Sequence, residues 1–113
     1  MGKDPRFIYD DFSDRLYISC KKPSEKIYGS VRVLNLTIDF TEERKAVAIE
    51  LRGASKYLES IGIDSSILNN LSGAEIVFKQ QRDGFLINFV LTSGTKVERI
   101  PYNIMTEKAV LTS

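Results

Sequence analysis

The fold is decided by residues 34–51, which read Leu-Asn-Leu-Thr-Ile-Asp-Phe-Thr-Glu-Glu-Arg-Lys-Ala-Val-Ala-Ile-Glu-Leu. Apolar and polar side chains alternate over the first seven residues, and apolar side chains recur at every second position of the last seven. Alternation with a period of two is typical of a β-strand with one buried face. A polar stretch, residues 41–44, separates the two runs, so the sequence predicts an antiparallel hairpin.

The apolar residues also predict a register for this hairpin. If residues 41–44 form the loop, Phe40 pairs with Lys45, and the apolar pairs on one face are Ile38 with Val47, Leu36 with Ile49 and Leu34 with Leu51. The opposite face then carries Asn35 with Glu50, Thr37 with Ala48 and Asp39 with Ala46. A slip of one residue would turn every apolar side chain toward solvent, so the pattern specifies the register.

Upstream of this hairpin the sequence predicts another. The β-prone runs 7–9 and 16–20 flank the acidic segment 10–14, which has the composition of a turn. Alternation in the second run places Cys20 on the apolar face, where we expect it to be a small core residue.

A change of phase precedes residue 34. Val31 and Val33 alternate on the opposite phase to Leu34. Since a regular strand cannot change phase, either a bulge lies near residues 33–34 or a separate short strand ends there.

Two short helices are expected next. Apolar residues recur at helical spacing over 54–61, with Ser55 as the expected N-cap and Gly62 as the end. Asp64 is placed to cap a second helix over 65–72, which Gly73 would stop. Neither helix is long enough to be stable alone, so both are expected to pack on a sheet.

Residues 74–101 predict a three-stranded meander. Asp83-Gly84 is a strong hairpin signal, and a two-residue loop there pairs Phe78 with Phe89 and Ile76 with Leu91. A turn at Ser93-Gly94 leads to a charged third strand, which Pro101 is expected to end. Residues 102–113 are expected to be a loosely held tail.

These elements predict a single domain, residues 1–113, of the α+β class. We expect a mainly antiparallel β-meander of about seven strands with one or two short helices packed on a sheet face. The composition agrees, since 42% of the 113 residues are hydrophobic and 27% are charged. Whether the two groups of strands share one sheet or form two stays open.

Several kinds of chemistry are excluded by composition. The chain has no histidine and one cysteine, so zinc sites of the Cys/His type and Ser-His-Asp catalytic triads are impossible. No glycine cluster has the spacing of a phosphate loop. A net charge of +1 argues against broad binding to nucleic acid, although residues 21–32 include a modest basic stretch. We expect no cofactor, and the composition favours a non-catalytic role over an enzymatic one without deciding between them.

Carboxylates supply the remaining candidates. Asp10, Asp11 and Asp14 do not have the spacing of a calcium loop, and we expect Asp10 and Asp14 to hold the first hairpin turn. Asp39 and Glu50 project from the polar face of the first sheet, where Tyr9 and Tyr17 are candidate walls. The candidate ligand or partner surface therefore comprises Tyr9, Asp10, Asp14, Tyr17, Asp39 and Glu50.

The first half of the chain resembles a family of small prokaryotic domains of unknown function. The resemblance rests on Tyr9-Asp10, residues 15–18 (Arg-Leu-Tyr-Ile), Ile38-Asp39 and residues 46–55, which end in Arg-Gly-Ala-Ser. It covers residues 7–58. The family's turn after the Asp strand and its glycine before Ile-Glu are absent, since Arg44-Lys45 and Ala48 stand there. The resemblance implies a small β-rich α+β domain without established activity, with some members partnering small toxin-like proteins.

The leading hypothesis is a non-catalytic binding module that acts through protein–protein contact, with a protein partner or as a homodimer. It rests on the missing catalytic devices and on open sheet edges, which are templates for strand pairing. The alternative is a small-molecule or divalent-ion binder, or a weak enzyme, using the carboxylate face. A third is weak nucleic-acid binding by residues 21–32. One cysteine and no apolar leader favour a cytoplasmic location without a membrane.

Overall fold

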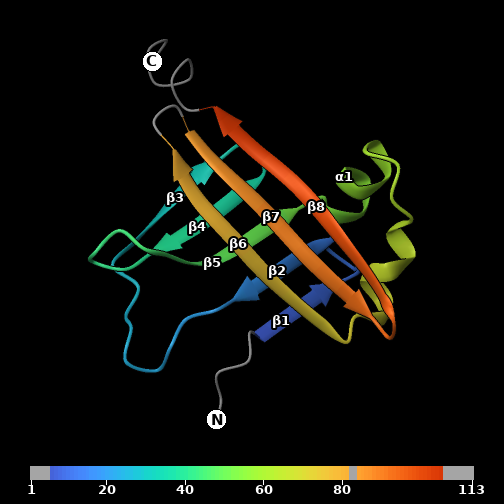
Figure 1. Ribbon diagram of the computed structural model, residues 1–113, viewed down its shortest axis with the longest axis horizontal. Helices are drawn as coiled ribbons and strands as arrows, with labels where there is room; N and C mark the ends of the chain where they lie inside the picture. Colours follow the sequence, from blue (N-terminus) through green and yellow to red (C-terminus); the bar gives the residue numbers. More distant parts are fainter. Residues whose placement is uncertain (1–5, 82–83, 106–113) are drawn as a thin grey trace.

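A computed structural model describes residues 6–81 and 84–105, which form eight strands and two short helices (Figure 1). The first sheet has the order β1-β2-β5-β4-β3 and comprises β1 (Arg6–Asp10), β2 (Arg15–Ser19), β3 (Gly29–Val33), β4 (Leu36–Phe40) and β5 (Ala46–Arg52). The second sheet is a meander of β6 (Gly73–Gln81), β7 (Gly84–Ser93) and β8 (Lys96–Met105). All pairs are antiparallel, so the predicted α+β, mainly β fold is confirmed, and the strands form two sheets.

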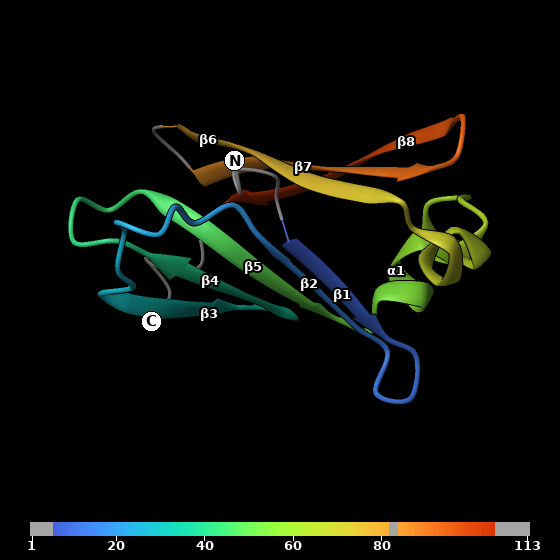
Figure 2. The ribbon, with the colours of Figure 1, turned by 90° about the horizontal axis from the view of Figure 1, so that it is seen from below.

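The two sheets form separate layers whose strands run crosswise (Figures 1 and 2). At one end of the layers lie α1 (Ala54–Ser60) and the 3₁₀ helix η1 (Ser65–Asn70). As predicted, Asp64 caps η1, because its carboxylate accepts a hydrogen bond from the Ser66 N–H at 3.0 Å. Gly53 and not Ser55 occupies the N-cap position of α1. No helix among residues 6–81 and 84–105 is long and apolar enough to cross a bilayer.

One apolar core joins the layers and the helices. It is formed by Leu16, Ile18, Leu36, Ile38, Ile49 and Leu51 of the first sheet, Ile87, Phe89, Leu91 and Ile100 of the second, and Leu58, Ile67 and Leu68 of the helical segment. Each fully buried side chain of this size contributes roughly 1.5–3 kcal/mol. The helices are therefore held by side chains that they insert into the core.

The predicted register of the central hairpin is wrong by two residues. Leu36 lies opposite Leu51 and Ile38 opposite Ile49, with an irregularity between Asp39 and Phe40. Phe40 pairs with Ala46 and Asp39 with Ala48, so Val47 is the extra residue of a bulge. A shift of two residues keeps the same side chains on the buried face, which is why the pattern could not distinguish the two registers.

The change of phase before residue 34 marks a separate strand. β3 ends at Val33 and pairs with β4 through a two-residue loop, Leu34-Asn35, so the prediction that Leu34 faces Leu51 is wrong. Leu34 is 78% exposed. The Asn35 side chain instead fixes the loop, because its amide donates to the Arg52 carbonyl at 2.7 Å and its carbonyl accepts from the Tyr102 hydroxyl.

The second sheet also differs in register from the prediction. Ile76 lies opposite Phe89 and Phe78 opposite Ile87, and Gln81 pairs with Gly84, a shift of two residues from the expected register. The loop, residues 82–83, lies outside the described residues. The apolar face is unchanged, since the shift is again even.

Two further predictions are corrected. Pro101 does not end the last strand, because it pairs with Asn88 within β8, a strand at the edge of its sheet, where a missing N–H is tolerated. Residues 102–105 are therefore strand, and residues 106–113 lie outside the described part. Cys20, expected in the core, is exposed: it follows the last residue of β2, and although its N–H still donates to the Val47 carbonyl at 2.8 Å, its side chain is not buried.

Candidate functional site

The structure divides the six predicted site residues between two places. Tyr17 and Glu50 are direct neighbours on the outer face of the first sheet, and Asp39 lies one row away on the same face. The other three candidates lie in the first hairpin and its turn: Tyr9, Asp10 and Asp14. The structure therefore does not bring the predicted set together as one site.

Tyr9 and Asp14 belong to a cluster that joins the first hairpin to α1. The Asp14 carboxylate accepts hydrogen bonds from the Tyr9 hydroxyl at 2.5 Å and from the Ser55 N–H and hydroxyl at 2.9 and 2.8 Å. The Asp14 carbonyl accepts from the N–H groups of Gly53 and Ala54. Asp14, which has a φ of 58°, thus caps a helix that begins forty residues later in the chain.

The same contacts shift two pKa values. Partial burial, together with the hydrogen bond to the Asp14 carboxylate, raises the pKa of Tyr9 to about 12. Partial burial alone would raise the pKa of Asp14, but the hydrogen bonds from Tyr9 and Ser55 outweigh it and hold the pKa below its usual value. The cluster thus joins the neutral phenol of Tyr9 to the Asp14 carboxylate, which accepts three hydrogen bonds from within the protein.

Asp10 holds the first turn, as expected. Its carboxylate accepts from the Ser13 hydroxyl at 2.9 Å and from the Phe12 N–H at 3.0 Å, and these bonds lower the pKa of Asp10. Asp14 contributes to the same hairpin through Tyr9 and in addition bonds Ser55 of α1.

The outer face of the first sheet is an ion-pair network. Glu50 lies between two guanidinium groups, 3.5 Å from Arg15 and 3.6 Å from Arg52. Arg52 also donates to the Thr37 hydroxyl at 2.7 Å. Across residues 6–81 and 84–105, no three acidic or cysteine side chains gather where they would hold a metal ion. Around Glu50 the face is polar and its charges are paired.

A different surface, at the β3 edge, was missed at the level of sequence. Four large apolar side chains are exposed within eight residues: Ile27 (45%), Tyr28 (76%), Val31 (45%) and Leu34 (78%). They lie on or beside β3, the outermost strand of the first sheet. Figure 2 shows β3 at the margin of its sheet, away from the second layer. Exposed apolar side chains gathered on one free strand are typical of an interaction surface.

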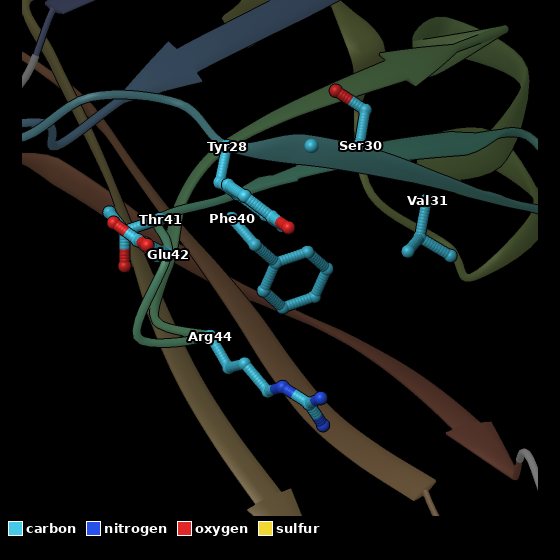
Figure 3. Close-up of a pocket in the computed structure, with 8 residues that line it drawn as sticks. Tyr28, Ser30, Val31, Phe40, Thr41, Glu42 and Arg44 are labelled. Atoms are coloured by element: carbon cyan, nitrogen blue, oxygen red, sulfur yellow. The ribbon is translucent and has the colours of Figure 1, made fainter.

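A hollow of about 490 Å³ lies beside this edge. Figure 3 shows Tyr28, Phe40 and Arg44 around the same space, with Val31 at one side. The Phe40 ring packs edge-on against Phe78 of β6, at 6.3 Å between centroids, and so anchors the hollow to the core. The hollow has an apolar wall and a guanidinium at its rim.

The main chain of β3 offers hydrogen-bonding groups to this side. In a two-residue hairpin the pair next to the loop, here Val33 and Leu36, exchanges both hydrogen bonds. By alternation, Val31 also bonds to β4, and the N–H and C=O groups of Ser30 and Arg32 point away from it. The β3 edge is therefore a template for another strand.

The sequence carried a weak signal for this surface. Val31 and Val33 showed a short strand, but only the strand order, with β5 between β2 and β4, shows that β3 is an edge. Comparison with protein-family models, curated proteins and solved structures finds no match for this chain. The resemblance of residues 7–58 to the small prokaryotic domains of unknown function thus stays a prediction.

Proposed function

We propose that this protein is a non-catalytic binding module that recognises another polypeptide by adding one of its strands to the β3 edge. The observation that carries the proposal is the free edge itself, with exposed Tyr28, Val31 and Leu34 beside outward main-chain groups. In β-augmentation the main chain supplies affinity, and pockets for alternate side chains supply specificity. The hollow against Phe40 is such a pocket.

The carboxylate face supports the alternatives less well. Glu50 already has two arginine partners, and Asp14 accepts three hydrogen bonds from within the protein. An ion or substrate would have to displace these partners. The outer face also mixes arginines with carboxylates, which does not favour a phosphate backbone. The free edge is the surface with unmet bonding capacity.

A pull-down from the native cell tests the proposal. The wild-type chain is compared with Ser30→Pro, which removes an N–H that points away from β4 and so leaves the main-chain hydrogen bonds of the hairpin intact, although the Ser30 hydroxyl bond to Asp39 is lost. Arg99→Glu, at an exposed position on β8, is the matched surface control. We expect a protein retained by the wild type and by Arg99→Glu, and lost with Ser30→Pro. Identical captured sets for all three chains would contradict a role for the edge.

A further inference from the structure

We infer that the strand added to β3 is β3 of a second copy, so that the first sheets of two copies join into one continuous antiparallel sheet. The inference rests on the proposed use of the β3 edge and names its occupant. The β3 edge is complementary to itself in its main-chain hydrogen-bonding groups, its charges and its shape. Such self-complementarity is what a two-fold interface requires.

One register uses both outward-pointing residues of the strand. A two-fold axis through Val31 places Val31 opposite Val31 of the second copy and Ser30 opposite Arg32 of the second copy. Ser30 and Arg32 are the residues whose N–H and C=O groups point away from β4. Both therefore form hydrogen-bonded pairs across the interface, and Val31 falls at the non-hydrogen-bonded position between them.

The charges match in the same register. Across the outer face, Asp39 of β4 is the neighbour of Ser30, and Ser30 would be the neighbour of Arg32 from the second copy. Among the described residues Arg32 has no carboxylate within ion-pair distance, and Asp39 accepts only the Ser30 hydroxyl, at 2.6 Å. Arg32 of the second copy and Asp39 would lie two strand spacings apart, roughly 10 Å. An extended arginine side chain spans this distance above the small Ser30 side chain. The two-fold axis forms this pair twice.

The inner face is complementary in shape. Gly29 has open space where a side chain would stand, since a Cβ there meets nothing within 4 Å, and it borders the hollow with Phe40. The register places Val33 of the second copy opposite Gly29. Its side chain enters the hollow beside the Phe40 ring, because Gly29 and Phe40 are paired. Exposed Tyr28 would lie opposite the exposed Leu34 of the second copy.

Leu34 supplies an independent observation. It has a φ of 56° at the first position of the two-residue loop, where a type II′ hairpin favours glycine. A positive φ is strained for a residue that carries a side chain. This leucine is also 78% exposed, so the folded monomer gains little from its side chain. Backbone strain and exposed apolar area coincide at the position that meets Tyr28 of the second copy.

Charge reversal tests the register while keeping folding visible. In a dimer of Arg32→Glu, the introduced carboxylate of each copy faces the Asp39 carboxylate of the other copy. In a dimer of Asp39→Lys, the introduced cation of each copy faces the Arg32 guanidinium of the other copy. In a mixed dimer of the two variants both pairs are attractive. We expect sedimentation velocity to show dimers of the wild type. For each variant alone the dissociation constant of the dimer should be about tenfold larger, and in the equimolar mixture dimers should form again. Concentrations up to about 1 mM are used because an interface of one short strand belongs to the weak class.

The outcomes separate this inference from the proposed function. A strictly monomeric wild type, or variants that neither weaken alone nor recover on mixing, would overturn pairing of β3 with itself. If the wild type is monomeric but still captures a protein that Ser30→Pro loses, the edge binds a different chain and only the inference fails. If nothing is captured and no dimer forms, both fail. Arg99→Glu is again the control and is expected to dimerise like the wild type.

Discussion

At the scale of single residues, the Asp14 cluster explains why three separate pieces of the sequence belong together. Tyr9, Asp14 and Ser55 come from β1, the first turn and α1, and they meet at one carboxylate. The helix has seven residues and no capping side chain of its own. A helix this short depends on such external partners. The prediction that Asp14 is structural thus gains a specific basis, the capping of α1.

Replacing Asp14 tests this account. Asp14→Ala removes the cap, leaves the Tyr9 hydroxyl without its acceptor and puts alanine at a φ of 58°. We expect a loss of about 2 kcal/mol in the free energy of unfolding and a fall in Tm of roughly 10 °C. Asp14→Asn tolerates the left-handed conformation and keeps one acceptor oxygen, so it should lose less than half as much. Both are measured by thermal and urea unfolding. A wild-type Tm that rises with millimolar Mg²⁺, and does so only while Asp14 is present, would show a ligand site instead.

Tyr9 should make stability depend on alkaline pH. Its folded pKa is raised from 10.0 to about 12, so the neutral phenol is favoured in the folded state. This contribution is fully present below the unfolded pKa and is lost as pH rises from about 10 toward 12. The Tm of Tyr9→Phe should therefore fall less than the Tm of the wild type when the pH rises from about 9.5 to about 11.5, a window set by the ordinary and the raised pKa of Tyr9. Equal losses in both proteins would contradict the coupling between Tyr9 and Asp14.

At the scale of elements, the β3–β4 hairpin combines a firm anchor with a strained, exposed tip. The Asn35 side chain ties the loop to β5 and to Tyr102 of β8. Its neighbour Leu34 has a positive φ and projects into solvent. Structure that holds a strained residue in place is common at functional sites.

Two substitutions at Leu34 separate strain from surface. Leu34→Gly relieves the left-handed strain and should stabilise the monomer by about 0.5 kcal/mol, after the greater flexibility of unfolded glycine is subtracted. Leu34→Ala keeps the strain and should leave monomer stability nearly unchanged. Both should weaken dimerisation, because both remove the side chain that meets Tyr28. Urea unfolding at low concentration and sedimentation at high concentration measure the two effects. A Leu34→Gly protein that is less stable than the wild type and dimerises as strongly would contradict both the strain and the role of the Leu34 side chain in dimerisation.

The elements also show how far sequence reasoning reaches. Alternation identified the buried face of β4 and β5 correctly, since Leu36, Ile38, Ile49 and Leu51 all lie in the core. It could not fix the register, because shifts of two residues preserve the faces and the bulge at Val47 leaves no pattern of its own. Asp64 was predicted as a cap because the N–H group that donates to its carboxylate, that of Ser66, is two residues away. Asp14 does bond Tyr9 across the first hairpin, as expected, but its role at α1 was not predicted because Ser55 is forty-one residues away.

At the scale of the whole molecule, the two layers leave sheet edges in different states. β8, at one edge of the second sheet, carries Pro101 and charged side chains, which discourage further pairing. β1 contacts β6 of the other layer. β3 has exposed apolar residues, a glycine and outward main-chain groups without such protection. Among the strands that the structure describes, β3 is therefore the edge that we propose for pairing, in the register inferred from its own residues.

The most direct test of this claim is a disulfide at the two-fold axis, in a Cys20→Ser background that removes the exposed native thiol. Opposed residues at a non-hydrogen-bonded position have Cα atoms about 4.5 Å apart, within disulfide range, so Val31→Cys should cross-link two copies under mild oxidation. Val33→Cys is the matched control on the same strand and face, because the two copies of residue 33 would lie roughly 13 Å apart. The account predicts a covalent dimer with Val31→Cys and little with Val33→Cys. No cross-link at residue 31, or equal cross-linking at both positions, would contradict it.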